Sequence, residues 1–167
     1  FARQTNRSDL DAFTYLYPLA DAALIRKMEG AEITMERLQI VRHALDNGAL
    51  TEQFFVAHLG QVPREDFITY TADFFLQLEE TRWAIIAGRV NGTLIVSVRN
   101  LGYSKNAGEF VKKVFADVGS AGGHRAMAKA VVPWDRFVEK HGDLSPADVT
   151  AFLKAQATEF LGEPAKK

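Results

Sequence analysis

The sequence predicts an α/β fold, a small mixed β-sheet that contains a β-hairpin, is flanked by helices and is preceded by N-terminal helices. Two β-rich runs, Trp83–Val90 and Leu94–Arg99, are joined by Asn91-Gly92, a pair that favours the type I′ turn of a hairpin. A helical pattern of apolar residues follows the hairpin. Further helix start signals lie within the first 48 residues and at Ser145.

The first 48 residues carry three helix signals. Ser8 with Asp11 three residues on predicts a capped helix, which Pro18 interrupts. Asp21 is placed to cap a second helix that runs to about Met28. A third helix begins near Thr34 and ends at Asn47-Gly48, with a buried face that we predict to contain Leu38, Val41 and Leu45.

The next elements alternate between strand and helix patterns. Leu50–His58 is rich in Phe, Val and Thr and predicts one strand. After Pro63 a helix is predicted, with a buried side made of Phe67, Thr71, Phe74, Phe75 and Leu78. In the second hairpin strand Ile95, Ser97 and Arg99 share one face, and Leu94, Val96 and Val98 share the other.

The last third of the chain is predicted as helix, loop, short helix, strand and helix. The first helix has a continuous apolar stripe, formed by Ala107, Phe110, Val111, Val114, Phe115 and Val118. Gly119–His124 is predicted as a loop, Arg125–Lys129 as a short helix and Ala130–Trp134 as a strand. Ser145 caps the final helix, with Pro146 at its first position and Asp148 three residues after the cap.

The amino-acid composition excludes several classes of protein. The 167 residues are 47% apolar and 25% charged, which is typical of a globular domain. No apolar run approaches the roughly 20 residues of a membrane span, so we expect no membrane partner. The chain has no cysteine, which excludes disulfides, thiolate zinc sites and cysteine nucleophiles and is consistent with a cytoplasmic location.

Charge is unevenly distributed along the chain. The formal net charge is −1, which argues against a protein that coats nucleic acid by charge alone. Between Arg99 and Lys129, however, six basic residues stand against two acidic ones, so this segment carries +4 and the rest −5. Such a local basic segment suggests a small anionic ligand; the alternative is ordinary surface charge on one helix.

Two groups of residues are candidates for holding that ligand. In the predicted loop, Gly122 and Gly123 would let the backbone approach an anion, while His124 and Arg125 would add a donor and a charge. Arg99, with Ser97 beside it, ends a strand and could hold a phosphate with two hydrogen bonds. The alternatives are a plain connecting loop and a solvated arginine.

The sequence offers no motif for a metal or a nucleophile. Its four histidines, His43, His58, His124 and His141, are isolated from one another and from acidic pairs. No nucleophile elbow, Walker loop or dinucleotide fingerprint occurs.

The hairpin that ends in Ser97-Val98-Arg99, the helix after it, and the run Ala121-Gly122-Gly123-His124-Arg125-Ala126-Met127-Ala128 resemble the DHHA1 domain of DHH superfamily phosphoesterases. The likeness is to the exopolyphosphatase-related and nanoRNase-like branch and covers Leu50 to Trp134. More weakly, residues 1–48 look like the last helices of a DHH domain with its linker. The resemblance thus implies helices of a DHH domain in 1–48 and a DHHA1-like domain, with a C-terminal helix, in 49–167.

In that family the DHH domain holds two divalent metal ions, usually manganese, and the DHHA1 domain grips the substrate. Carried over to this sequence, the resemblance implies that Arg99, Ser97, Gly122, Gly123 and His124 bind a phosphate-bearing ligand, either an oligonucleotide, a nucleotide or polyphosphate. Ala121 stands where the family often has glycine, and Arg125 replaces a small residue or proline.

The Asp-rich and Asp-His-His metal motifs do not occur in these 167 residues. We therefore expect the chain to bind and not to cleave, with manganese supplied by a DHH domain elsewhere. If helices 9–28 have lost that domain's sheet, their apolar side chains predict a homodimer. Two other interpretations stay open: a non-catalytic nucleotide or nucleic-acid binding module, and an interaction domain whose glycine-rich segment is a connector.

Overall fold

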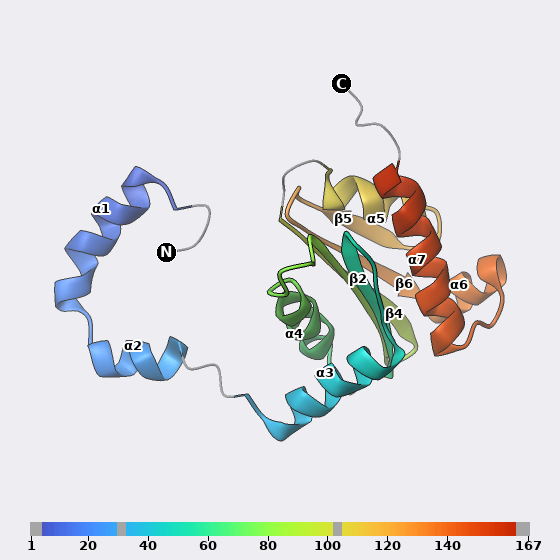
Figure 1. The fold of residues 1–167 in the computed structure, drawn as a ribbon, viewed down its shortest axis with the longest axis horizontal. Helices are drawn as coiled ribbons and strands as arrows, with labels where there is room; N and C mark the ends of the chain where they lie inside the picture. The colour runs from blue at the N-terminus through green and yellow to red at the C-terminus, as the bar shows by residue number, and fades with distance from the viewer. Residues whose placement is uncertain (1–4, 30–32, 102–104, 163–167) are drawn as a thin grey trace. The chain divides into compact units, whose positions relative to one another are not determined.

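The computed structural model describes residues 5–29, 33–101 and 105–162 and confirms a mixed α/β fold (Figure 1). At its centre is a six-stranded sheet of order β1-β2-β3-β4-β6-β5. Only β2 and β3 run parallel; every other neighbouring pair is antiparallel. The strands are β1 (Ala49–Leu50), β2 (Phe54–Gln61), β3 (Trp83–Val90), β4 (Thr93–Asn100), β5 (Ser120–Gly123) and β6 (Met127–Pro133).

The described residues divide into two compact units, Phe1–Thr34 and Met35–Lys167. The first unit contains α1 (Arg7–Leu16), the short 3₁₀ helix η1 (Tyr17–Leu19) and α2 (Ala22–Glu29). The second contains the sheet with α3 (Met35–Asn47), α4 (Asp66–Phe75), α5 (Ala107–Phe115), α6 (Trp134–His141) and α7 (Pro146–Gly162). None of the described helices is long and apolar enough to cross a membrane.

The first unit begins two residues earlier than predicted. Asn6, not Ser8, caps α1: its side chain accepts from the N–H of Asp9, and the Asp9 carboxylate accepts from the N–H of Asn6. Asp21 caps α2 as expected, by accepting from Ala23 and Leu24. The apolar side chains Leu10, Phe13, Leu16 and Leu24 are exposed, and self-association through them stays a prediction.

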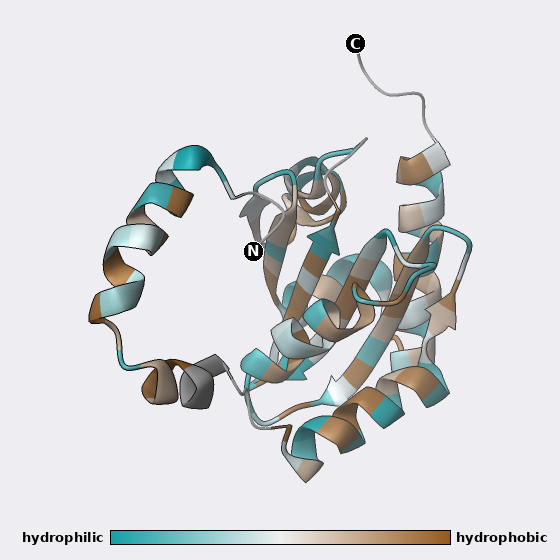
Figure 2. Ribbon diagram, turned by 60° about the vertical axis from the view of Figure 1, so that its left-hand side comes forward, coloured by the Kyte–Doolittle hydropathy of each residue, from teal (hydrophilic) through white to brown (hydrophobic). Residues whose placement is uncertain are grey.

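One face of the sheet is covered by α5, α6 and α7 (Figure 1). The predicted apolar stripe of α5 is buried there in full, from Ala107 to Val118. Its largest fully buried side chains are Phe110, Phe115, Phe137 and Leu153. Ser145 and Asp148 form the predicted capping box at the start of α7. Apolar and polar bands alternate along the strands, so each strand contributes to both faces (Figure 2).

On the other face, the described helices α3 and α4 pack against β2, β3 and β4. The rings of Phe55 and Phe75 stack there with centroids 3.7 Å apart. The prediction for α3 is partly wrong, because Val41 and Ala44 are buried whereas Leu38 and Leu45 are exposed.

Strand boundaries show where local patterns mislead. The hairpin turn is confirmed, with positive φ at Asn91 (46°) and Gly92 (75°). The predicted strand Leu50–His58 is instead two strands, because the Thr51 hydroxyl and main chain form a turn with Phe54. The predicted strand Ala130–Trp134 is β6, which ends at Pro133, and Trp134 begins α6.

Candidate functional site

The register of the sheet brings the predicted ligand-binding residues onto one face. Ser97 of β4 pairs with Lys129 of β6, which pairs with Gly122 of β5. The neighbouring row runs from Arg99 to Met127. Directly paired residues point to the same side of a sheet. This side is the one opposite α5, α6 and α7, because the alternate β6 residues Ala128, Ala130 and Val132 belong to the core beneath those helices.

Arg99 is held in place from several directions. Its Nε donates to the Asp73 carboxylate of α4 at 2.6 Å, and its Nη1 donates to Ser97 Oγ at 3.1 Å and to the Val98 carbonyl at 3.3 Å. Only 16% of the side chain is exposed. Within the described residues Nη2 has no hydrogen-bond partner.

A second basic side chain lies beside Arg99 on this face. Lys129 Nζ forms an ion pair with the Glu65 carboxylate at 2.5 Å, and Glu65 immediately precedes α4. We call the side of the sheet that carries Ser97, Arg99, Gly122, Met127 and Lys129 the open face. Asp73 of α4 thus pairs with Arg99 of this face, and Glu65, just before α4, pairs with Lys129. The four charges sum to zero, which differs from the locally basic site that the sequence predicts.

The glycine-rich segment is a strand and not a loop. Ser120–Gly123 forms β5, the edge strand, and the helix predicted for Arg125–Lys129 is absent because Met127–Pro133 forms β6. The His124 N–H donates to the Met127 carbonyl at 2.8 Å, which closes a turn between the two strands. The predicted helix Arg125–Lys129 is therefore wrong, and an anion at this segment would meet the turn between β5 and β6.

The turn is tied down by the start of α5. The N–H groups of Ala107 and Gly108 donate to the carbonyls of Arg125 and His124 at 3.0 and 3.2 Å. The Asn100 side chain donates to the Arg125 carbonyl as well, at 3.0 Å. A Cβ at Gly108 would lie 2.6 Å from the Gly123 oxygen, so glycine is needed for this close approach. The start of α5 thus holds the turn in place.

Gly122 and Gly123 have different roles in the strand. Gly123 has φ 151°, and a Cβ there would lie 2.4 Å from Ala128 Cα. A Cβ at Gly122 would meet nothing nearer than Lys112 Cε, at 4.0 Å. Because hydrogen-bonded and non-bonded pairs alternate along an antiparallel ladder, the bond between His124 and Met127 turns the N–H of Gly123 toward the open edge of the sheet.

The structure gathers the predicted residues on one face without bringing them into contact. Ser97 touches Arg99, whereas His124 lies two strands away, across Met127, at roughly 10 Å between backbones. His124 and Arg125 are exposed at the turn. The roles of Arg99, Ser97, Gly122, Gly123, His124 and Arg125 in binding therefore stay predictions.

Sequence reasoning missed several residues of this face. The helical pattern predicted for Arg125–Lys129 hides Met127 and Lys129; in the strand, Met127 is 53% exposed and lies between Arg99 and the turn. Strand alternation from Ala128 to Val132 was the signal that could have found them. Glu65 and Asp73 could not be found, because their proximity depends on how α4 crosses the sheet.

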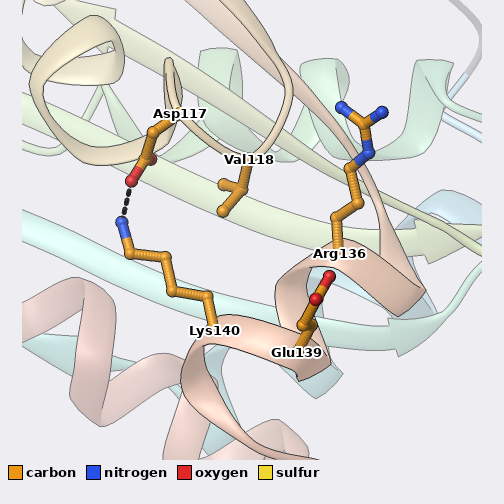
Figure 3. Close-up of a pocket in the computed structure, with 5 residues that line it drawn as sticks. All are labelled: Asp117, Val118, Arg136, Glu139 and Lys140. Carbon is orange, nitrogen blue, oxygen red and sulfur yellow. Dashed lines mark hydrogen bonds and ion pairs between the residues drawn. The ribbon is translucent and has the colours of Figure 1, made fainter.

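A pocket of about 310 Å³ lies elsewhere, between α6 and the end of α5. It is lined by Asp117, Val118, Arg136, Glu139 and Lys140. Lys140 points to Asp117, whereas Arg136 extends away from this pair (Figure 3). The hydrogen bond from Lys140 holds the pKa of the Asp117 carboxyl below its ordinary value. These opposite charges satisfy each other, and none of the predicted site residues lines the pocket.

The described residues offer no metal centre. Nowhere among them do three or more His, Asp or Glu side chains lie close enough together to hold an ion. The manganese that the family resemblance implies would therefore need ligands from outside this described part.

Comparisons with known proteins bear on the fold. No family model matches the sequence. The uncharacterized protein MJ1633 of Methanocaldococcus jannaschii is 28% identical over 134 residues, which cover 80% of this chain and 27% of that protein. The crystal structure of an exopolyphosphatase-related protein from Bacteroides fragilis superposes with a TM-score of 0.68 at 14% identity, over 94% of this chain and 45% of that one.

The chain thus spans less than half the length of these two proteins. At this level of identity the superposition shows a common fold and not a common activity. The observed sheet confirms two of the elements on which the sequence resemblance rested, namely the hairpin and the helix after it. The chain therefore shares its fold with part of an exopolyphosphatase-related protein, and its place in the DHH superfamily stays a proposal.

Proposed function

We propose that this chain is the substrate-binding part of a metal-dependent phosphoesterase of the DHH type, and that its open sheet face holds a phosphate-bearing ligand. The observation that carries the proposal is the register, which aligns Arg99 and Ser97 with Lys129 and Gly122 on a face that no described helix covers over β6. The metal ions and the hydrolytic step would belong to a DHH domain outside this chain.

The face offers two kinds of donor to a phosphate. Arg99 presents Nη2 from a guanidinium that Asp73 and Ser97 already orient, so little conformational entropy is lost on binding. At the far side, the N–H of Gly123 and the side chains of His124 and Arg125 surround the turn. Because these two groups lie roughly 10 Å apart, a ligand that engages both must carry more than one polar group.

Among ligands of this class, the structure favours a nucleotide or short oligonucleotide over polyphosphate. Met127 is half exposed between Arg99 and His124, and a thioether packs well against an aromatic base. Polyphosphate would place a charged oxygen against this apolar side chain, which costs desolvation without a compensating hydrogen bond.

Titration of the isotope-labelled chain with a 5′-phosphorylated dinucleotide, in the absence of divalent metal, tests this function. We expect saturable amide shifts in β4, β5 and the turn. Arg99→Ala should weaken binding about tenfold or more, because a charge-assisted hydrogen bond contributes about 1.5–3 kcal/mol. His124→Ala should also weaken binding.

Arg136→Ala is the matched control, because Arg136 is an exposed arginine of the pocket by α6, away from the open face. It should bind as the wild type does. Equal affinity of Arg99→Ala, His124→Ala and the wild type would refute the proposal and favour the interpretation of β5 and its turn as a connector.

A non-catalytic nucleotide-binding module would use the same face and give the same titration. The full-length gene product distinguishes the two. Manganese-dependent release of mononucleotide from the dinucleotide supports a phosphoesterase, whereas binding without turnover supports the regulatory module.

A further inference from the structure

We propose that Lys129 is a further ligand-binding residue of the open face, and that Glu65 holds it until a phosphate ligand displaces the carboxylate. This inference rests on the proposed function. It adds a binding residue and a way to distinguish ligands by their charge. Neither residue belongs to the Ser-x-Arg strand or to the Gly-Gly-His segment on which the resemblance depends.

The position of Lys129 is set by the sheet. It pairs with Ser97 on one side and Gly122 on the other, so it stands midway between Arg99 with its hydroxyl partner and the glycine edge. A ligand that reached from Arg99 to the turn would cross Met127, which is two residues along β6 from Lys129. The flexible four-carbon stem of Lys129 lets its ammonium group follow a ligand oxygen, which the fixed guanidinium of Arg99 cannot do.

The two ion pairs of this face differ in how easily they open. Arg99 has three hydrogen bonds to described residues and is 16% exposed, so its pair with Asp73 is part of the structure. Lys129 has one partner, and its side chain is 43% exposed while that of Glu65 is 46% exposed. Exposed pairs of this kind contribute little to stability, so exchange of the carboxylate for phosphate costs little.

The exchange discriminates between ligands by charge. A ligand with one negative charge gives Lys129 no more attraction than the Glu65 carboxylate did. The displaced Glu65 also remains nearby and repels the ligand. A ligand with two or more negative charges gains more from Lys129 than Glu65 supplied. The pair should therefore favour a terminal phosphomonoester, which is mostly dianionic near neutral pH, over an internal phosphodiester.

Titrations of four variants of the full chain with the 5′-phosphorylated dinucleotide, at low ionic strength, test the inference. Lys129→Ala should weaken binding about tenfold, whereas Lys129→Arg should keep most of the affinity. Glu65→Gln should tighten binding by up to about fivefold, because it removes the competing carboxylate. The double variant Glu65→Gln/Lys129→Ala should bind more weakly than Glu65→Gln and at most slightly more tightly than Lys129→Ala, since without the lysine the carboxylate acts only by weak repulsion of the ligand.

The chain offers a matched control on the opposite side of the sheet. Lys113 of α5 and Glu159 of α7 form an ion pair at 3.1 Å with similar exposure, 39% and 59%. Lys113→Ala and Glu159→Gln change the net charge in the same way and should leave the affinity unchanged. Comparison with the dinucleotide that lacks the 5′-phosphate should show that the effect of Lys129→Ala is largest for the phosphorylated ligand.

The possible failures are distinguishable. If Arg99→Ala weakens binding and Lys129→Ala does not, the proposed function stands and the role of Lys129 is wrong. If Lys129→Ala weakens binding but Glu65→Gln does not tighten it, the proposal that the ligand displaces the Glu65 carboxylate is refuted. If the wild-type chain does not bind the dinucleotide, both the function and this inference are overturned. The same holds if Lys113→Ala and Glu159→Gln change the affinity as much as Lys129→Ala and Glu65→Gln do.

Discussion

At the residue scale, the adjacent glycines Gly122 and Gly123 differ in the space around their α-carbons. Gly123 has a positive φ, and an added Cβ would lie 2.5 Å or less from the backbone of Met127 and Ala128. Gly122 has room for a methyl group. We expect Gly123→Ala to lower the free energy of unfolding by about 2 kcal/mol or more and Gly122→Ala by less than about 1 kcal/mol, measured by urea denaturation. Equal losses would contradict the geometry of β5.

A buried histidine gives the second prediction at this scale. His58 is 1% exposed, and its Nδ1 accepts from the N–H of Gly60 at 3.0 Å. Its Nε2 has no partner among the described residues. Burial, reinforced by the positive charges of Arg89 and His43, lowers the pKa of His58 from 6.5 to about 4.

Between those two pKa values the unfolded chain binds a proton that the folded chain does not. Stability should therefore rise with pH from about 4 to about 6.5, and acidification through this range should cost about 3 kcal/mol. His58→Gln should be less stable at pH 7 but should lose less on acidification. Urea midpoints measured in steps from pH 7 to pH 4 check this; parallel curves for the two proteins would show that His58 does not titrate as described.

At the scale of elements, Asn100 connects three of them. Its side chain, 5% exposed at the end of β4, donates to the carbonyls of Lys105 and Arg125 at 2.8 and 3.0 Å. It thereby joins β4 to the residues just before α5 and to the turn before β6. We expect Asn100→Ala to cost about 1–3 kcal/mol, because two part-buried hydrogen bonds are lost and the Lys105 carbonyl loses its donor, whereas the Arg125 carbonyl keeps the N–H of Ala107.

The same change should speed amide hydrogen exchange at His124, Ala107 and Gly108, whose N–H groups hold the turn and the start of α5 together. Asn47→Ala is the matched control, because the Asn47 side chain donates to the His43 carbonyl at an exposed helix end. Exchange at the turn should not change in that variant. Unaltered exchange in Asn100→Ala would mean that α5 alone orders the turn.

The elements that the sequence predicted well are those whose pattern is local. The β3–β4 hairpin has alternation and a turn that needs positive φ, and α5 has six apolar residues on one stripe. Ser-Ala-Gly-Gly, by contrast, has little intrinsic strand preference, and β5 exists because it pairs with β6 and packs under α5. The Ala, Met and Lys residues after it favour helix, and sheet pairing overrides that preference.

In the candidate site, too, the sequence predicts only the features that depend on a local pattern. Strand alternation placed Ser97 and Arg99 on one face, and that placement is confirmed. The partners Asp73 and Glu65 come from a helix 24 or more residues away along the chain, and only the crossover between the parallel strands β2 and β3 brings them near. No local pattern contains that information.

At the scale of the whole molecule, both hydrophobic clusters lie within residues 41–161. We therefore expect a fragment of residues 35–167 to unfold cooperatively with nearly the urea midpoint of the full chain, measured by fluorescence of Trp83 and Trp134. It should also keep the affinity of the open face, since every residue of that face lies within the fragment. A fragment that fails to fold would show that residues 1–34 support the second unit; the full chain is the control.

The place of α7 has a consequence for how the chain acquires its structure during synthesis. This last described helix packs on β2, and the His58 N–H donates to Thr150 Oγ1 across 92 residues of sequence. The strands β2, β3 and β4 can pair as soon as they leave the ribosome, because they are consecutive. Their apolar face toward α7 stays in water until nearly the whole chain has been made. Protection of the nascent chain against aggregation should thus be needed longest at β2, the first long strand to be synthesised and among the last to be covered.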